Sequence, residues 1–220
     1  MRVNQFRRFT YFFTSDNSKL SKAFESEAFK KFKKSEGIKE LNVYQKKDDY
    51  FMIVDADISF NSEKIVNALK LHMNSEGVNS ILSYHSEALE RIYKLDQKVI
   101  YSSFEGQLKM DIREKKRFVW TLLLEPDLIE EYKRVHAMNM AWPEITSNMK
   151  TVGVKDMEIY IHHDQVVLIM DAIPEFDLDE IGPKWQKLPR EEEWQTYVAK
   201  FQRTDPESSI QEKWQDMGVL

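Results

Sequence analysis

Two side chains suited to acid–base chemistry, Tyr132 and His136, lie four residues apart in the second half of the sequence. Residues at this spacing share one face of a helix, and Leu128 on the same face predicts that they point inward. A histidine titrates near neutral pH and can take or give a proton, and a tyrosine hydroxyl can donate a hydrogen bond to a bound molecule. The pair is therefore a candidate for proton transfer. A hydrogen-bonded pair in the core is the alternative.

Tryptophans gather in the same half of the chain. Trp142 precedes Pro143, and because proline disfavours helical backbone before it but fits the first turn of a helix, we predict a helix break there. All five tryptophans lie beyond residue 119, Trp185, Trp194 and Trp214 among them. Indole rings can stack on the apolar faces of sugars, although packing in the core is their commoner role.

The elements that must position these residues occur twice. Residues 37–44 (GIKELNVY) align with residues 153–160 (GVKDMEIY), 116 positions later (153 − 37), and the match continues to Phe60 and Phe176. Residues 8–13 align with residues 117–122 at an offset of 109 (117 − 8), so the second copy has about seven extra residues in its first helix. Features of both copies are expected to serve the fold. The Tyr132, His136 and Trp142 group occurs in one copy only and is a candidate for chemistry.

Each copy has the pattern strand, long helix, strand, tight turn, strand, helices. In the first copy, apolar residues every four positions predict one helix over residues 20–32, and the polar residues 46–49 predict a hairpin turn. Residues 65–73 and 81–92 are expected to be helical, and residues 98–104 to form a closing strand. This order, βαββαβ, is that of a ferredoxin-like unit.

Two such units commonly pair sheet to sheet. We therefore predict an α+β fold in which tandem ferredoxin-like units, residues 1–110 and 111–220, form a pseudo-dimer of the dimeric-α/β-barrel type within one chain. Residues 106–116 would be the polar linker. A homodimer of the whole chain is a further option, because the final strand at residues 217–220 is very short.

Several other chemistries are excluded or weakly supported. The chain has no cysteine and no glycine-rich phosphate loop, its net charge of −5 argues against nucleic-acid binding, and no apolar run is long enough to cross a membrane or act as a signal peptide. Residues 162–164 (HHD) suggest a metal site, but they align with residues 46–48 (KKD), which indicates a solvated turn. Residues 191–193 (EEE) are explained by the start of a helix. We expect no metal, no cofactor and a cytoplasmic location.

The second copy resembles the L-rhamnose mutarotase family, and especially its L-fucose mutarotase branch. The resemblance covers about residues 116–217 and rests on Tyr132-x-x-x-His136, residues 142–145 (WPEI), residues 153–160 and residues 212–214 (EKW). It implies a dimeric α/β barrel and cofactor-free interconversion of the α and β anomers of a 6-deoxy-hexose. His136 would be the main acid/base, and Tyr132 its partner or a donor to the sugar. By the same resemblance, the residues that wall the substrate pocket are Trp142, Tyr160, Trp194 and Trp214.

The first copy shares only the scaffold motifs and resembles a degenerate, structural repeat. In the family pattern the histidine and the tryptophan of WPE are about four residues apart, whereas His136 and Trp142 differ by six (142 − 136). Two inserted residues would rotate a helix by about 200°. A non-catalytic sugar-binding or interaction module on the same scaffold is therefore the alternative. A barrel-type oxygenase is a third option, for which the sequence supplies no haem or metal ligands.

Overall fold

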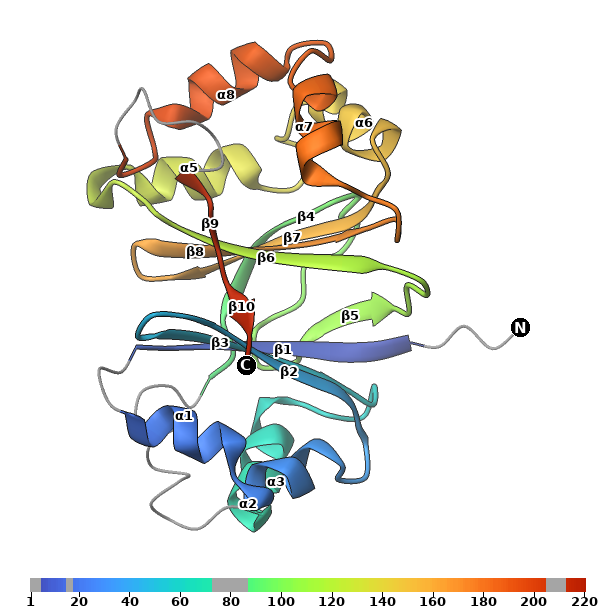
Figure 1. Cartoon of the computed structure of the whole chain (residues 1–220), viewed down its shortest axis with the longest axis vertical. Helices are drawn as coiled ribbons and strands as arrows, with labels where there is room; N and C mark the ends of the chain where they lie inside the picture. Colours follow the sequence, from blue (N-terminus) through green and yellow to red (C-terminus); the bar gives the residue numbers. More distant parts are fainter. Residues whose placement is uncertain (1–4, 15–17, 73–86, 205–212) are drawn as a thin grey trace. The chain divides into compact units, whose positions relative to one another are not determined.

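A computed structural model describes residues 5–14, 18–72, 87–204 and 213–220 (Figure 1). The chain divides into two compact units. Unit 1 comprises Met1–Glu90, Ile100–Asp111 and Met217–Leu220, and unit 2 comprises Arg91–Val99 and Ile112–Asp216. Each unit holds one five-stranded sheet. No helix in the described ranges has the length and apolar character that crossing a bilayer requires.

Unit 1 has the order of a ferredoxin-like unit. Its elements are β1 (Gln5–Thr14), α1 (Ser18–Glu25), α2 (Glu27–Lys33), β2 (Ile38–Lys46), β3 (Asp49–Ala56), α3 (Ser62–His72), β5 (Gln107–Met110) and β10 (Gly218–Val219). The sheet order is β10-β2-β3-β1-β5, and β1 pairs antiparallel with both β3 and β5. The closing strand β5 therefore lies beside the first strand, as in the ferredoxin-like pattern.

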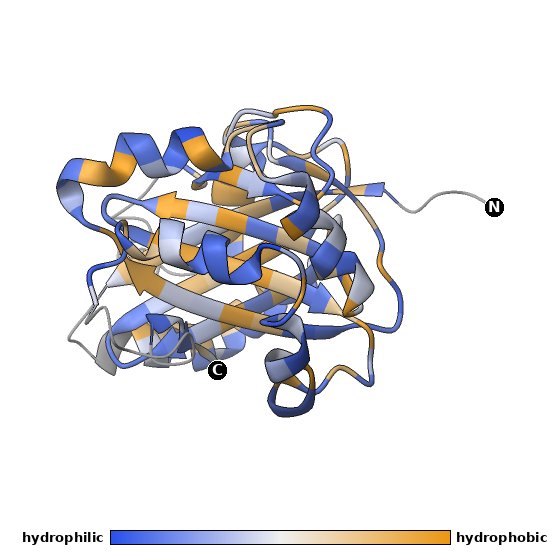
Figure 2. Ribbon diagram, turned by 90° about the horizontal axis from the view of Figure 1, so that it is seen from above, coloured by the Kyte–Doolittle hydropathy of each residue, from blue (hydrophilic) through white to orange (hydrophobic). Residues whose placement is uncertain are grey.

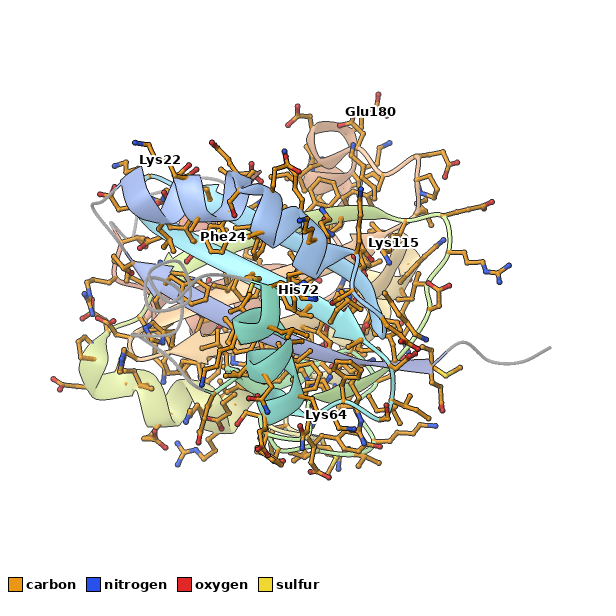
Figure 3. All side chains as sticks on the ribbon, turned by 90° about the horizontal axis from the view of Figure 1, so that it is seen from below. Lys22, Phe24, Lys64, His72, Lys115 and Glu180 are labelled. Carbon is orange, nitrogen blue, oxygen red and sulfur yellow. The ribbon has the colours of Figure 1, made fainter. Side chains whose placement is uncertain are left out.

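The helix predicted over residues 20–32 is two helices. Ser26 separates them, because its hydroxyl accepts a hydrogen bond from the Phe29 amide (3.1 Å) and donates one to the Ala23 carbonyl (2.7 Å). Serine is a strong N-cap residue, so the second helix starts here. Phe29 and Phe32 of the second helix are buried in the core, and Ala28 packs against it partly buried. Figure 3 draws the side chains of the described residues, with Phe24 of α1 labelled.

Unit 2 repeats the plan with longer helical connections. Its elements are β4 (Glu90–Lys94), β6 (Lys116–Leu123), the 3₁₀ turn η1 (Pro126–Leu128), α5 (Ile129–His136), α6 (Pro143–Thr151), β7 (Val154–His162), β8 (Gln165–Ala172), α7 (Leu178–Trp185), α8 (Glu191–Ala199) and β9 (Gln215–Asp216). The sheet order is β4-β7-β8-β6-β9. The break before Pro143 is confirmed, since Pro143 is the first residue of α6. In Figure 2 the helices carry both apolar and polar residues, as expected for helices that cover a sheet on one side.

The internal repeat is visible in matched contacts. The Arg8 guanidinium pairs with the Asp55 carboxylate on neighbouring strands of unit 1 (2.7 Å), and Arg117 pairs in the same way with Asp171 in unit 2 (2.6 Å). Both second strands have an irregularity after their first residue, at Ile38/Glu40 and Val154/Asp156. These equivalences support an α+β chain of tandem ferredoxin-like units. The dimeric-α/β-barrel arrangement of the two stays a prediction.

Three predictions about the connection between the copies were wrong. Residues 98–104 do not form a strand, and the predicted linker contains β5. Of the helix predicted over residues 81–92, residues 81–86 lie outside the described residues, and residues 90–92 belong to β4 instead. β4 pairs with β7 of unit 2, held by a buried ion pair of Arg91 with Glu158 (2.8 Å). Such non-local pairing leaves no periodic signal in the strand itself.

Candidate active site

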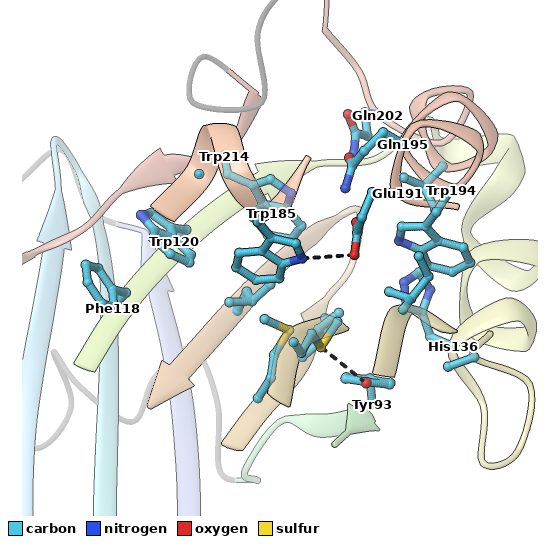
Figure 4. Close-up of a pocket in the computed structure, with 18 of the residues that line it drawn as sticks. Tyr93, Phe118, Trp120, His136, Trp185, Glu191, Trp194, Gln195, Gln202 and Trp214 are labelled. Atoms are coloured by element: carbon cyan, nitrogen blue, oxygen red, sulfur yellow. Dashed lines mark hydrogen bonds between the residues drawn. The ribbon is translucent and has the colours of Figure 1, made fainter. Parts of the chain in front are cut away.

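Unit 2 contains a cavity of about 430 Å³ between its sheet and helices α5, α6, α7 and α8 (Figure 4). β6, β7 and β8 form its floor, and residues of α5, α6, α7 and α8 form its walls. Four of the five tryptophans line it, namely Trp120, Trp185, Trp194 and Trp214. A space of this size with apolar walls and a few polar groups is typical of a small-molecule site.

His136, the last residue of α5, faces this cavity and is only 7% exposed. Its Nδ1 lies 2.9 Å from the backbone carbonyl oxygen of Tyr132. Because a carbonyl oxygen only accepts, Nδ1 must carry the proton in the neutral ring, which leaves a lone pair on Nε2. Burial lowers the pKa of His136 to about 4, although the bond to the Tyr132 carbonyl opposes this shift. The imidazole is therefore neutral at pH 7 and can act as a proton acceptor.

Tyr132 lies one turn earlier on α5 and lines the same cavity. Its ring centroid is 4.1 Å from that of His136, so the two side chains share one face of the helix as predicted. Burial raises the pKa of the Tyr132 hydroxyl well above its usual range. The phenol therefore stays protonated and is suited to donating a hydrogen bond.

The carboxyl group of Glu191 is the polar feature that the sequence analysis missed. Glu191 is the first residue of α8, is 3% exposed and lines the cavity. Its Oε1 accepts a hydrogen bond from Asn148 Nδ2 and one from Trp185 Nε1, both 2.9 Å long (Figure 4 draws the second). Burial raises its pKa, while these hydrogen bonds oppose the rise. The acidic run at residues 191–193 was explained by the helix start alone, and nothing local distinguishes its first member.

Of the four predicted wall residues, Trp194 and Trp214 line the cavity and the other two do not. Trp142 packs behind Trp194, with ring centroids 5.3 Å apart, and stacks on Tyr197 at 5.9 Å. The Arg190 guanidinium lies over the Trp142 ring, 4.0 Å from its centroid. Trp142 therefore supports the wall from outside the lining.

Tyr160 is on β7, one position after Ile159, the last residue of this strand that lines the cavity. Met157 and Ile159 belong to the lining, and side chains alternate between the two faces of a strand, so Tyr160 lies on the opposite face. Its hydroxyl donates a hydrogen bond to Glu158 Oε1 (3.2 Å). Tyr44 occupies the aligned position of the first copy and is buried too, which indicates a role in the fold.

Comparison of the two sequence copies did not single out two of the residues that line the cavity, Tyr93 and Trp120. Tyr93 belongs to β4, and its ring lies edge-on to His136 at a centroid distance of 6.1 Å. Burial raises the pKa of the Tyr93 hydroxyl to about 12. Trp120 lies on β6. Alternation along β6 could have indicated Trp120, whereas Tyr93 could be found only from the pairing of β4 with β7.

A second, more polar cavity of about 520 Å³ adjoins the first at His136, Tyr93 and Ala141. Its wall includes residues of the segment between α5 and α6 together with the start of α6, the segment residues being Ala137, Met138, Asn139 and Ala141. His136 thus borders both cavities. The turn at residues 162–164 is a hairpin between β7 and β8, as predicted, and no group of metal-ligating side chains suited to an ion occurs in residues 5–14, 18–72, 87–204 or 213–220.

Comparison with known proteins shows which families and relatives the chain resembles. A family model for L-rhamnose mutarotase matches residues 117–219. An L-fucose mutarotase from Xanthomonas campestris pv. campestris is 29% identical over 107 residues, which cover 48% of this chain and 86% of that protein. A UPF0734 protein from Dictyostelium discoideum is 30% identical over 117 residues, covering 50% of this chain and 92% of that protein. The second half of the chain, residues 117–219, is therefore similar to the L-rhamnose mutarotase family.

Proposed function

We propose that unit 2 interconverts the α and β anomers of L-fucose or a related 6-deoxy-hexose such as L-rhamnose. The observation that carries the proposal is the neutral His136 with its free Nε2 lone pair beside a cavity walled by tryptophans. The similarity to the L-rhamnose mutarotase family and to the Xanthomonas L-fucose mutarotase supplies the substrate class.

The reaction needs two coupled proton movements. A base removes the proton from the anomeric hydroxyl, C1 and its oxygen form a carbonyl, and the bond from C1 to the ring oxygen breaks as that oxygen receives a proton. Rotation about the C1–C2 bond followed by the reverse transfers closes the other anomer. His136 Nε2 takes the first proton in this scheme.

The remaining groups hold the sugar. Tyr132 donates a hydrogen bond to a sugar oxygen, and its carbonyl orients the His136 ring. Trp194 and Trp214 present apolar surface to the C5-methyl side of the sugar, and Trp142 supports Trp194 from behind. Tyr160 has no contact with the sugar in this scheme because it lies on the other face of β7.

The test is anomer exchange measured by saturation-transfer NMR, with L-fucose and L-rhamnose as substrates and protein-free buffer as the control. We expect exchange between the anomeric signals to accelerate in proportion to protein concentration. Absence of acceleration with both sugars would overturn the proposal.

A non-catalytic sugar-binding module is the second candidate. It is favoured by one observation: Trp142, six residues after His136, lies outside the cavity lining. Calorimetry on the same samples separates the two functions, since binding without exchange supports the module and exchange supports the enzyme.

A further inference from the structure

The proposed chemistry requires a proton donor as well as a base, and Glu191 is placed to be one. The carboxyl group lines the same cavity as His136, and the two come from different helices, α8 and α5 (Figure 4). Asn148 and Trp185 both donate to Oε1, so a proton on this carboxyl group would be carried by Oε2, and the Gln195 side chain also hydrogen-bonds the group. Asn148 is itself anchored by a hydrogen bond to the Pro189 carbonyl (2.9 Å).

We propose that Glu191 is the second proton-transfer group of this site and protonates the ring oxygen while His136 accepts the proton of the anomeric hydroxyl. This inference rests on the proposed function and adds to it the partner of the base. On ring opening the Glu191 carboxyl becomes a carboxylate and the His136 imidazole becomes an imidazolium. On closure both protons return, so one anomeric conversion leaves each group in its starting state.

The pairing solves an electrostatic problem. A buried imidazole that gained a proton alone would place an uncompensated charge among tryptophans, which is costly in an apolar site. When Glu191 gives up its proton in the same step, the new positive charge forms together with a negative one in the same cavity, and no net charge enters the site.

Burial favours the protonated carboxyl of Glu191, whereas its hydrogen bonds with Asn148, Trp185 and Gln195 favour the carboxylate, and burial is the larger of the two effects. Of the described residues, none forms an ion pair with Glu191, and its burial raises the pKa of the carboxyl. The other titratable residues that line the cavity are Tyr93, Tyr132, His136 and Asp216, and none of them is a cation at pH 7. The nearby cations of α6 and the α8 cap are paired elsewhere, Lys150 with Asp96 and Arg190 with Glu144.

Tyr132 is the rival donor, and its chemistry is less suitable. Burial raises the pKa of its hydroxyl far above neutral, so release of its proton to the ring oxygen is unfavourable. A carboxyl whose pKa has been raised toward the working pH is a better matched acid. Tyr132 therefore donates a hydrogen bond to the sugar, and Glu191 transfers the proton.

The experiment compares Glu191→Gln with Glu192→Gln, its exposed neighbour on α8. Glutamine keeps an oxygen that can accept from Asn148 and Trp185 but cannot transfer a proton. We expect Glu191→Gln to lower kcat for anomer exchange by about 10²–10⁴-fold while KM changes less than about threefold, and Glu192→Gln to match the wild type.

The pH profile and chemical rescue distinguish proton transfer from a structural role. Wild-type kcat should fall as pH rises and Glu191 loses its proton, and Glu191→Gln should lose this alkaline decline. Added formic or acetic acid should accelerate Glu191→Ala and leave the wild type unchanged. An active wild type with Glu191→Gln within threefold of it would overturn this inference and leave the proposed function standing. An inert wild type would overturn both.

Discussion

Unit 1 and unit 2 share a scaffold but fill the space between sheet and helices differently. In unit 1 the rings of Phe13, Phe24, Phe29 and Phe32 contact one another there, with centroid separations from 5.1 to 6.0 Å. In unit 2 four tryptophans surround a cavity of about 430 Å³ that His136 and Glu191 also line. Phenylalanine brings no polar atom, so the first filling makes a core, whereas the second leaves room for a ligand.

The features that both units share explain how one scaffold can take two fillings. The Arg–Asp pair between neighbouring strands and the irregularity at the start of the second strand occur in both. Gly37 and Gly153 also occupy the same position, each with a positive φ that suits glycine. These shared features fix the backbone of the strands, so the side chains that face the helices can differ without changing the strand order.

The largest expected effect concerns His136, the candidate base that unit 2 has and unit 1 lacks. His136→Gln should lower kcat for anomer exchange by about 10²–10⁴-fold, because the amide cannot accept a proton although it can still donate to the Tyr132 carbonyl. His72→Gln, on α3 of unit 1, is the matched control and should retain wild-type exchange. Saturation-transfer NMR measures both variants. Equal rates in His136→Gln and wild type would remove His136 from the mechanism.

The shared ion pairs should behave alike. Asp55→Asn removes the carboxylate partner of the buried Arg8, and Asp171→Asn that of the largely buried Arg117, so each should lower the free energy of unfolding by about 3–5 kcal/mol. Urea unfolding followed by circular dichroism reports both units, and tryptophan fluorescence reports unit 2, since every tryptophan lies beyond residue 119. A marked cost at one aspartate only would contradict their equivalence.

Alanine substitutions at aligned positions of the two units should differ in their effect on the free energy of unfolding, because one unit has a packed core and the other a cavity. Leu41 is buried in the packed core of unit 1, and Met157, 116 positions later (157 − 41), lines the cavity of unit 2. Leu41→Ala should lower the free energy of unfolding by about 2–5 kcal/mol, and Met157→Ala by less, because the cavity already deprives Met157 of neighbours on one side. The same urea experiment tests this, and a larger loss for Met157→Ala would refute it.

The smallest effect is the pH dependence of stability. The pKa of His136 is lowered from about 6.5 to about 4 in the folded chain, so the unfolded chain binds a proton more readily between these values. Stability contributed by the neutral ring is complete above pH 6.5 and is lost as pH falls toward 4, by about 3 kcal/mol. His136→Gln should show a shallower loss of unfolding free energy over this interval. Parallel curves for variant and wild type would indicate that His136 titrates normally.

Much of the candidate site followed from local spacing. Tyr132 and His136 face one cavity because helical residues four apart share a face. The helix α6 begins at Pro143 because proline fits the first turn of a helix. Tyr160 was misplaced because strand alternation puts it opposite Met157 and Ile159. The apolar period of four residues predicted one helix, but the Ser26 hydroxyl caps a second helix and the segment is therefore broken there.

The sequence by itself determined the repeat, the ferredoxin-like order of elements and the helix face that carries Tyr132 and His136. These follow from local periodicity and from self-alignment, which need no distant contact. Only the tertiary structure placed Tyr93 beside His136, moved Trp142 behind Trp194, and joined Glu191 to Asn148 and Trp185 across three helices. The contacts Tyr93–His136, Trp142–Trp194 and Asn148–Glu191 each join residues more than 40 positions apart in the sequence. The role of Glu191 depends also on its burial. The local sequence pattern predicts neither long-range contacts nor the burial of a polar group.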